Sequence, residues 1–326
     1  MYEQAYLPEG CRLSTKENRD ACASIAALEW ARNEGRILEG VATMCDGELN
    51  LIVSVGGFTG IIPREEAAFS ADGEPIKDIA IISRVGKPIC FMVLGVLKHA
   101  EQGQPQLLLS RRAAQVECHR YHIEKLRPGD VIPARVTHLE SFGAFVDIGC
   151  GIVSLLSVDC ISVSRIRHPS DRLRQGMAIR VVVKSVDEEH RRIYVTMREL
   201  LGTWEENAAA FEAGQTVTGI VRSVESYGIF VELTPNLAGL SELREEMRPV
   251  AQQWIGQRAA VFIKSICRER MKIKLVLVDT YPDVGLPREL TYYYPERAQH
   301  ISHWLYSPPG CTRRIETDFD GEAEYE

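Results

Sequence analysis

The sequence predicts an all-β protein made of three tandem small domains, each with about five short strands. Two segments align without a gap over about twenty positions, GDVIPARVTHLESFGAFVDIG from Gly129 and GQTVTGIVRSVESYGIFVELT from Gly214. A weaker copy, GRILEGVATMCDGELNLIVSVGG, begins at Gly35. In the clear copies a Val-rich strand leads to an aromatic turn and a glycine-bounded strand pair, and a repeat of this length folds as a self-contained unit.

The first 34 residues differ in kind from the repeats. Ser14 or Thr15, followed by Glu17, can begin a helix, and Gly35 can end it. Four apolar residues recur at helical spacing between them, so we expect a helix that docks on the first repeat. These residues are Ala21, Ile25, Leu28 and Ala31.

The rest of the chain divides into repeats and connectors. We expect a degenerate first repeat at residues 35–112, a second at 129–198, a third at 214–278 and an acidic, aromatic tail at 279–326. The short connecting segments are helix-prone, which is typical of semi-rigid couplers. The tail is rich in Pro, Tyr and acidic residues, and we expect it to be partly irregular, with its last dozen residues disordered.

Charge is distributed unevenly along the chain. The formal net charge is −7, but residues 129–198 carry +2 and residues 214–278 carry +3. The negative charge lies elsewhere, with −1 in residues 35–112 and −6 in the tail. A basic balance that coincides with the two well-formed repeats is expected of nucleic-acid-binding modules.

Several classes of function find no support in the sequence. The nine cysteines are scattered and never spaced C-x-x-C, so neither a disulfide framework nor a zinc ribbon is indicated. Without a P-loop, nucleophile elbow, H-E-x-x-H or two-metal carboxylate cluster, we expect no enzyme, cofactor or small-molecule substrate. His300, His303 and Cys311 could suggest a metal, but we expect none. No apolar run approaches about 20 residues and no signal sequence is evident, so we expect a cytoplasmic protein without a membrane partner.

Strand alternation predicts two exposed aromatic rings on each well-formed repeat. In FGAFVDIG, Val146 and Ile148 share the core face, so Phe145 and Asp147 point outward. Phe142 has the opposite parity, but a bulge at Gly143 would bring its ring to the same surface. A single such aromatic is more often a core residue, and the recurrence favours exposure. In the third repeat Val231 and Leu233 point inward, Phe230 and Glu232 outward, and Tyr227 precedes Gly228.

The last strand of each repeat presents cations on its outer face. In the second repeat Ile193, Val195 and Met197 face the core, and Arg192, Tyr194, Thr196 and Arg198 face outward. In the third repeat Ile273 and Leu275 face the core, and Lys272 and Lys274 face outward. Rings beside cations on a small closed sheet suit single-stranded nucleic acid, because bases stack on the rings and phosphates pair with the cations.

These residues also carry a resemblance to a known family. The order G-x-V-x-(G/A)-x-V, (F/Y)-G-x-F-V, G-L and a basic (R/K)-I-x-(L/V) strand resembles the S1 RNA-binding repeat of the bacterial small-subunit ribosomal protein S1 family. The resemblance covers nearly all of residues 35–278 and implies five-stranded OB-fold barrels. The resemblance implies which residues of barrels like these face RNA, and strand alternation adds Lys274 to them. The candidate RNA-binding residues are Phe142, Phe145, Asp187, Arg192, Tyr227, Phe230, Lys272 and Lys274.

Some positions depart from the family pattern. Ser157 and Glu242 stand where the family often has a histidine, and Cys267 stands where the second repeat has Asp187. In the first repeat Leu49 and Ile52 replace both rings. That repeat resembles the leading, ribosome-attaching repeats of the family. The resemblance therefore implies that residues 1–112 bind the small ribosomal subunit while the other repeats bind single-stranded mRNA.

Two other functions remain open at this point. The protein could be a ribosome-independent RNA-binding regulator or RNA-decay accessory, or a protein-interaction scaffold for which RNA is irrelevant. The tail is ambiguous as well, because Tyr292–Tyr294 and Trp304 can stack on RNA or pack back on the third barrel. We expect them to pack.

Overall fold

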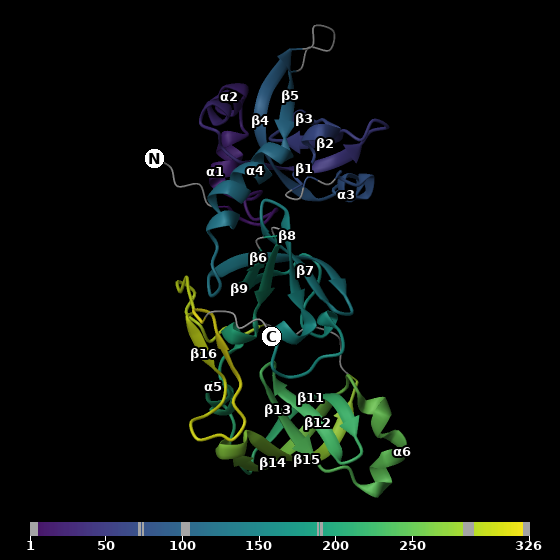
Figure 1. Cartoon of the computed structure of the whole chain (residues 1–326). Helices are drawn as coiled ribbons and strands as arrows, with labels where there is room; N and C mark the ends of the chain where they lie inside the picture. The colour runs from purple at the N-terminus through teal and green to yellow at the C-terminus, as the bar shows by residue number, and fades with distance from the viewer. Residues whose placement is uncertain are drawn as a thin grey trace.

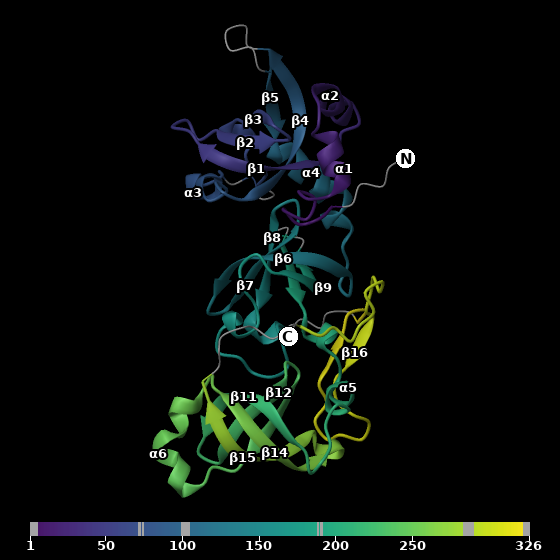
Figure 2. The same cartoon turned by 180° about the vertical axis from the view of Figure 1, so that it is seen from behind.

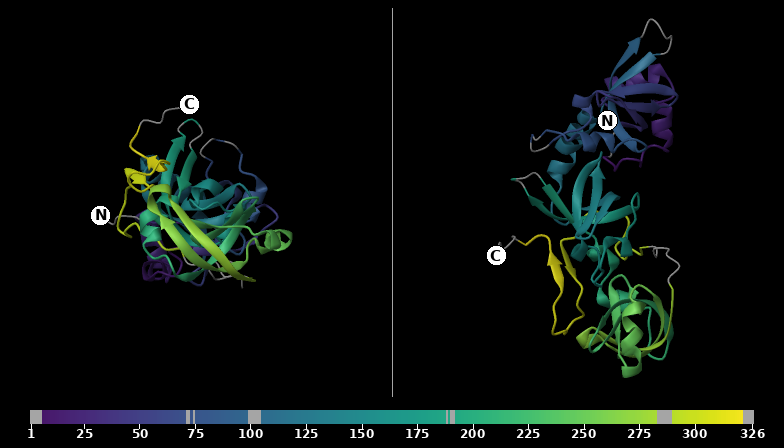
Figure 3. Two further views of the ribbon diagram at one scale, coloured as in Figure 1. Left: turned by 90° about the horizontal axis from the view of Figure 1, so that it is seen from below. Right: turned by 90° about the vertical axis from the view of Figure 1, so that its right-hand side faces the viewer.

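The computed structural model consists of three closed five-stranded barrels stacked in a column (Figure 1). The structure describes residues 6–70, 73, 75–98, 105–187, 189, 192–282 and 290–321. Seen from the side, the barrels remain in single file, with the first and third separated by the second (Figure 3). The predicted class, an all-β chain of tandem OB-like barrels, is confirmed.

The three barrels share one topology. In each, the first strand pairs antiparallel with the second and the fourth, and the third pairs in parallel with the fifth. Barrel 1 contains β1 Leu38–Cys45, β2 Leu51–Val55, β3 Phe58–Ile62, β4 Pro88–Lys98 and β5 Pro105–Ser110. Barrel 2 contains β6 Val131–Glu140, β7 Gly143–Gly149, β8 Ile152–Ser157, β9 Ala178–Asp187 and β10 Arg192–Thr196. Barrel 3 contains β11 Thr216–Glu225, β12 Gly228–Thr234, β13 Leu237–Ser241, β14 Arg258–Cys267 and β15 Lys272–Tyr281.

Short helices cover the loops and join the barrels. Between the third and fourth strands, barrel 1 carries α3 (Asp78–Ile82) and barrel 3 carries α6 (Arg248–Ala251). The connector α4 (Arg111–Tyr121) follows β5 directly, with Ser110 as its N-cap, and α5 (Trp204–Ala208) begins with a capping box. Both caps satisfy backbone N–H groups that a helix end would otherwise leave unpaired.

The N-terminal segment forms two helices where a single one was expected. Helix α1 (Lys16–Ala21) is capped by Thr15, and α2 (Ile25–Asn33) is capped separately by Ser24. Ser24 has an extended backbone, so the helical path breaks between them. Ala21, Leu28 and Ala31 are buried in the core of barrel 1. The apolar stripe therefore stabilises barrel 1 and is not free to bind a partner.

A buried ionic network joins barrel 1 to barrel 2. The Glu9 carboxylate accepts hydrogen bonds from Arg111 Nε at 2.7 Å and Nη2 at 3.1 Å, and the Glu9 backbone N–H donates to Asp147 Oδ2 at 2.7 Å. Asp147 also accepts from the N–H groups of Gly149 and Gly151. Asp147 does point away from the core of barrel 2, as predicted, but it is buried rather than exposed.

The C-terminal segment returns along barrels 2 and 3 beside α5 (Figures 1 and 2). It contains the two-stranded sheet of β16 (His303–Leu305) and β17 (Glu316–Asp318), so the expected disorder of the last dozen residues is wrong as far as Gly321. The Ile301 N–H donates to Gly129 O of barrel 2 at 2.8 Å. Trp304 packs in the core cluster of barrel 3, and Tyr292 and Tyr294 pack against that cluster, as expected. The Tyr292 ring also lies against Arg180 of barrel 2. The segment therefore fastens two barrels together.

Candidate nucleic-acid interface

Each of barrels 2 and 3 exposes a pair of aromatic rings at the start of its second strand. Phe142 lies in the turn before β7 and is 52% exposed, and its ring centroid is 6.0 Å from that of half-buried Phe145. Tyr227 lies in the matching turn before β12 and is 64% exposed, with its centroid 6.1 Å from that of Phe230. Both pairs meet edge to face at 89°. Two barrels therefore present the same platform to solvent.

The glycines between the rings, Gly143 and Gly228, do not form the bulges that the sequence predicted. Neither Gly143 nor Gly228 has a positive φ. The bulges lie on the neighbouring first strands, between Val136 and His138 and between Val221 and Ser223, and farther along β7 and β12, between Asp147 and Gly149 and between Glu232 and Thr234. A Cβ at Gly143 would lie 2.5 Å from Leu156 O, and one at Gly228 would lie 2.7 Å from Ser241 O. Glycine is required because the third strand passes too close for any side chain.

The predicted cations lie at different positions relative to the rings in barrel 3 and in barrel 2. In barrel 3, Phe230 pairs with Leu240, and Leu240 pairs with Lys274. Adjacent strands are about 4.8 Å apart, so the backbone of exposed Lys274 lies roughly 10 Å from the backbone of Phe230. Lys272 is exposed two residues earlier on the same face of β15. These lysines and the rings of barrel 3 share one surface.

In barrel 2 the charged positions lie closer to the junction with barrel 1. Arg192 and Asp187 are cross-strand partners at the β9–β10 hairpin, and exposed Arg192 lines a hollow that also includes Phe69 of barrel 1. Tyr194 occupies the position that Lys274 has in barrel 3, because it reaches Phe145 through Leu155. The structure therefore places Arg192 and Asp187 beyond the ring pair, toward barrel 1.

One outward position on β10 was predicted wrongly. Thr196 is buried, because its hydroxyl donates to Cys160 O and lies 2.6 Å from Glu199 Oε2. Arg198, just after the strand, is half-buried and donates to Glu199 and Thr317. Thr196 therefore packs within barrel 2, and Arg198 links barrel 2 to the C-terminal segment.

Barrel 1 offers no comparable platform among the residues that the structure describes. Leu49 stands in the left-handed region with φ of 67°, and Ile52 is half-buried. Asn50 replaces the glycine, and its side chain accepts from the Arg64 N–H and donates to Asp46. The tip of this hairpin is closed by hydrogen bonds instead of carrying two rings.

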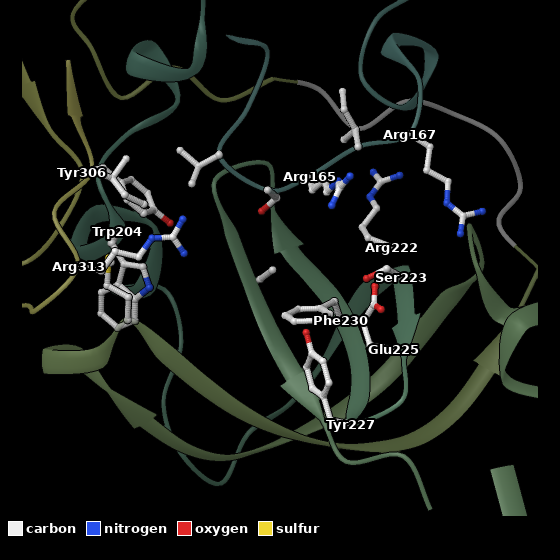
Figure 4. A pocket seen from close by; sticks show the side chains of 16 residues that line it. Arg165, Arg167, Trp204, Arg222, Ser223, Glu225, Tyr227, Phe230, Tyr306 and Arg313 are labelled. Atoms are coloured by element: carbon white, nitrogen blue, oxygen red, sulfur yellow. The ribbon is translucent and has the colours of Figure 1, made fainter. Parts of the chain in front are cut away.

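A hollow at the ring face of barrel 3 was missed by sequence reasoning. It has a volume of about 640 Å³, and its lining includes Tyr227 and Phe230 (Figure 4). Arg165 and Arg167 reach it from the loop after β8, and Arg313 reaches it from the C-terminal segment. Only the alternation of SRIRH hinted at the loop arginines, and no pattern in the sequence linked Arg313 to a barrel.

His300 and His303 form ion pairs with carboxylates, and the described part of the chain contains no metal cluster. Among the described residues, no group of three His, Cys, Asp or Glu side chains is arranged to hold a metal ion. His300 pairs with Asp130 and Asp320, and His303 pairs with Glu316. No helix in the described part of the chain is long and apolar enough to cross a membrane.

Comparison with known proteins agrees with this geometry. Residues 125–198, which contain barrel 2, match the S1 RNA binding domain family. Barrel 2 is therefore an S1-type domain, and barrels 1 and 3 share its five-stranded, OB-like topology.

The chain is similar in sequence to small ribosomal subunit proteins bS1, the family that its repeats resemble. It is 31% identical to the bS1 homolog of Bacillus cereus over 179 residues, which are 53% of this chain and 47% of that protein. It is 28% identical to bS1 of Neisseria meningitidis over 275 residues, 80% of this chain and 46% of that protein. It is also 28% identical to bS1 of Rickettsia conorii over 234 residues, covering 68% and 39%. The chain thus spans less than half the length of these curated relatives.

Proposed function

We propose that the protein binds single-stranded RNA through barrels 2 and 3 and acts in translation by holding mRNA at the small ribosomal subunit. The observation that carries this proposal is the repeated pair of solvent-exposed rings, Phe142 with Phe145 and Tyr227 with Phe230. Bases stack on such rings in proteins that bind single strands. The S1 match of barrel 2 and the names of the related ribosomal proteins support the same function.

The proposed site also includes the charged residues of the last two strands. Lys272 and Lys274 lie on the ring surface of barrel 3, where they can contact phosphates on either side of a stacked base. Arg192 and Asp187 extend the site of barrel 2 toward barrel 1. RNA would then follow the column of barrels instead of ending at one ring pair.

A double substitution of the rings tests the RNA-binding part. Stacking is worth roughly 1–3 kcal/mol per base, so Phe145→Ala with Phe230→Ala should weaken binding of a single-stranded RNA at least tenfold. The matched control is Phe262→Ala, an aromatic 37% exposed on β14 that pairs with the far end of β11. Fluorescence anisotropy measures the affinity, and unchanged binding by the folded double variant would refute the proposal.

The ribosomal part assigns attachment to residues 1–112. Barrel 1 lacks the ring platform and its charge is slightly negative, which suits contact with protein better than contact with RNA. The contact must use a surface other than the apolar stripe of α1 and α2, because that stripe is buried. The test is cosedimentation with small subunits of the whole chain and of a fragment that begins at residue 113 and keeps the C-terminal segment. If the fragment sediments as well as the whole chain, attachment lies elsewhere, and if neither sediments, the ribosome-independent regulator is favoured.

A further inference from the structure

The hollow at the ring face of barrel 3 is shared by three parts of the chain. Phe230 forms its floor, with Tyr227 below, in the view of Figure 4. Arg165 lies across the hollow from Phe230, and Arg313 lies at one side of the opening beside Tyr306. The volume of about 640 Å³ falls within the range of roughly 300–1,000 Å³ that ligand pockets show.

The lining is strongly cationic. Among the described residues that line the hollow, four are arginines and one, Glu225, is acidic. Arg222 differs from the other arginines because its guanidinium is paired with Glu232 and Asp171. Arg165, Arg167 and Arg313 are exposed, and no carboxylate of the described chain lies within ion-pair distance of their guanidinium groups. Three arginines at one opening are therefore available to an anion.

The backbone that carries these arginines is fixed relative to barrel 3. On the barrel 2 loop, the Val163 N–H donates to Asn236 Oδ1 at 2.9 Å and the Ser164 N–H donates to Pro235 O at 3.2 Å. In the C-terminal segment, the Ser307 hydroxyl donates to Arg313 O at 2.8 Å, and the Tyr306 hydroxyl donates to Asn236 O. The turn after β12 thus holds both the loop and the segment, so the arginines face the rings before any ligand arrives.

We propose that this hollow is a composite site for single-stranded RNA, formed by barrel 3, the barrel 2 loop and the C-terminal segment together. Bases stack on the rings of Phe230 and Tyr227, and the flanking phosphates contact Arg165 and Arg167 on one side and Arg313 on the other. The proposal deepens the proposed RNA-binding function and rests on it. It adds that RNA at barrel 3 spans the junction between two barrels and that the C-terminal segment contributes a phosphate-binding residue.

The test compares salt dependence in full-length variants. Each phosphate neutralised on a single strand contributes about 0.7 to the slope of log affinity against log salt. Replacing all three arginines, as Arg165→Ala, Arg167→Ala and Arg313→Ala together, should therefore flatten the slope by about 2 for a single-stranded RNA oligonucleotide. The control is Arg314→Ala, because Arg314 is adjacent in sequence, pairs with Glu316 and does not line the hollow. Anisotropy titrations at about 50 to 200 mM salt give the slopes.

A second comparison separates this site from RNA binding in general. If the wild-type chain does not bind RNA, or if Phe145→Ala with Phe230→Ala has no effect, the proposed function itself fails. If the rings matter but the triple arginine variant keeps the wild-type slope, the composite site is refuted and the ring-based function stands. If both contribute to one site, Arg313→Ala should weaken binding less in a Phe230→Ala background than in the wild type. Equal effects in both backgrounds would also refute a shared site. Because the three arginines are exposed, the arginine variants should unfold at the wild-type temperature.

Discussion

Removal of the Glu232 carboxylate should uncouple barrel 3 from barrel 2. This carboxylate accepts a hydrogen bond from Arg222 Nε at 2.7 Å within barrel 3, and Arg172 Nη1 of barrel 2 donates to it at 2.8 Å. The side chains of Arg172, Glu232 and Arg222 are 4%, 1% and 10% exposed. One buried anion thus holds two buried cations from two barrels.

The expected loss in the free energy of unfolding follows from the two buried charges that Glu232→Ala leaves without their shared partner. In Glu232→Ala, two buried guanidinium groups lose their shared partner, and Asp171 pairs only with Arg222, at 3.2 Å. Burial already lowers the pKa of Arg172 despite the neighbouring carboxylate, so the charged form there is costly. Breaking a buried ion pair on one side costs about 3–5 kcal/mol. We expect a loss of that size in the free energy of unfolding of the barrel 2–barrel 3 pair.

Urea denaturation of the full chain measures this loss, with Glu245→Ala as the matched control. Glu245 pairs with Arg248 on the same barrel but is 84% exposed, and a surface pair of this kind contributes about 0–1 kcal/mol. Glu232→Gln keeps the shape and one acceptor oxygen, so its cost should fall between the two. The reasoning is refuted if Glu232→Ala costs no more than Glu245→Ala.

Two further changes probe the barrel 1–barrel 2 junction and the ring platform. Burial, with the charge of Glu9 adding to it, raises the pKa of Asp147 to about 7, so the folded chain holds a proton there that the unfolded chain has released. The stability from this proton is complete below about pH 4 and is lost as the pH rises to about 7, at roughly 1.4 kcal/mol per pH unit. Denaturation of Asp147→Asn across that window should lack this decline, and parallel curves for the variant and the wild type would contradict it. Gly228→Ala should cost about 1–3 kcal/mol in a melting experiment, because the new Cβ would lie 2.7 Å from Ser241 O, whereas Gly47→Ala, with nothing within 4 Å, should cost almost nothing.

The repeat pattern predicted the barrels and their ring faces because both follow from local rules. Alternation fixes which side of a strand meets the core, so Val146 and Ile148 inside and Phe145 outside could be inferred from the sequence. Alternation does not say what lies against the outer side. Thr196 was therefore assigned to solvent, although Cys160 and Glu199 cover it.

The arginine hollow could not be inferred for a related reason. Its cations come from positions 165, 167 and 313, and their meeting depends on how the C-terminal segment returns along the barrels. The turn residue Asn236 fixes that path, since its amide donates to Arg198 O and Gly202 O while its side-chain oxygen holds the barrel 2 loop. Such long-range contacts leave no periodic signal in the sequence.

The two outward acids place each proposed RNA surface beside a junction. Asp147 and Glu232 occupy equivalent positions two residues after Phe145 and Phe230, and each binds the element that precedes its barrel. At about 3.3 Å per strand residue, acid and ring lie roughly 7 Å apart on one face. In barrel 1 the equivalent position is Ser54, which is exposed, and that barrel carries no ring pair in its described hairpin. The strand that docks a barrel on the preceding part of the chain therefore also presents the ring. A base stacked on that ring would lie beside the preceding barrel, whose residues Arg165 and Arg167 line the hollow at barrel 3.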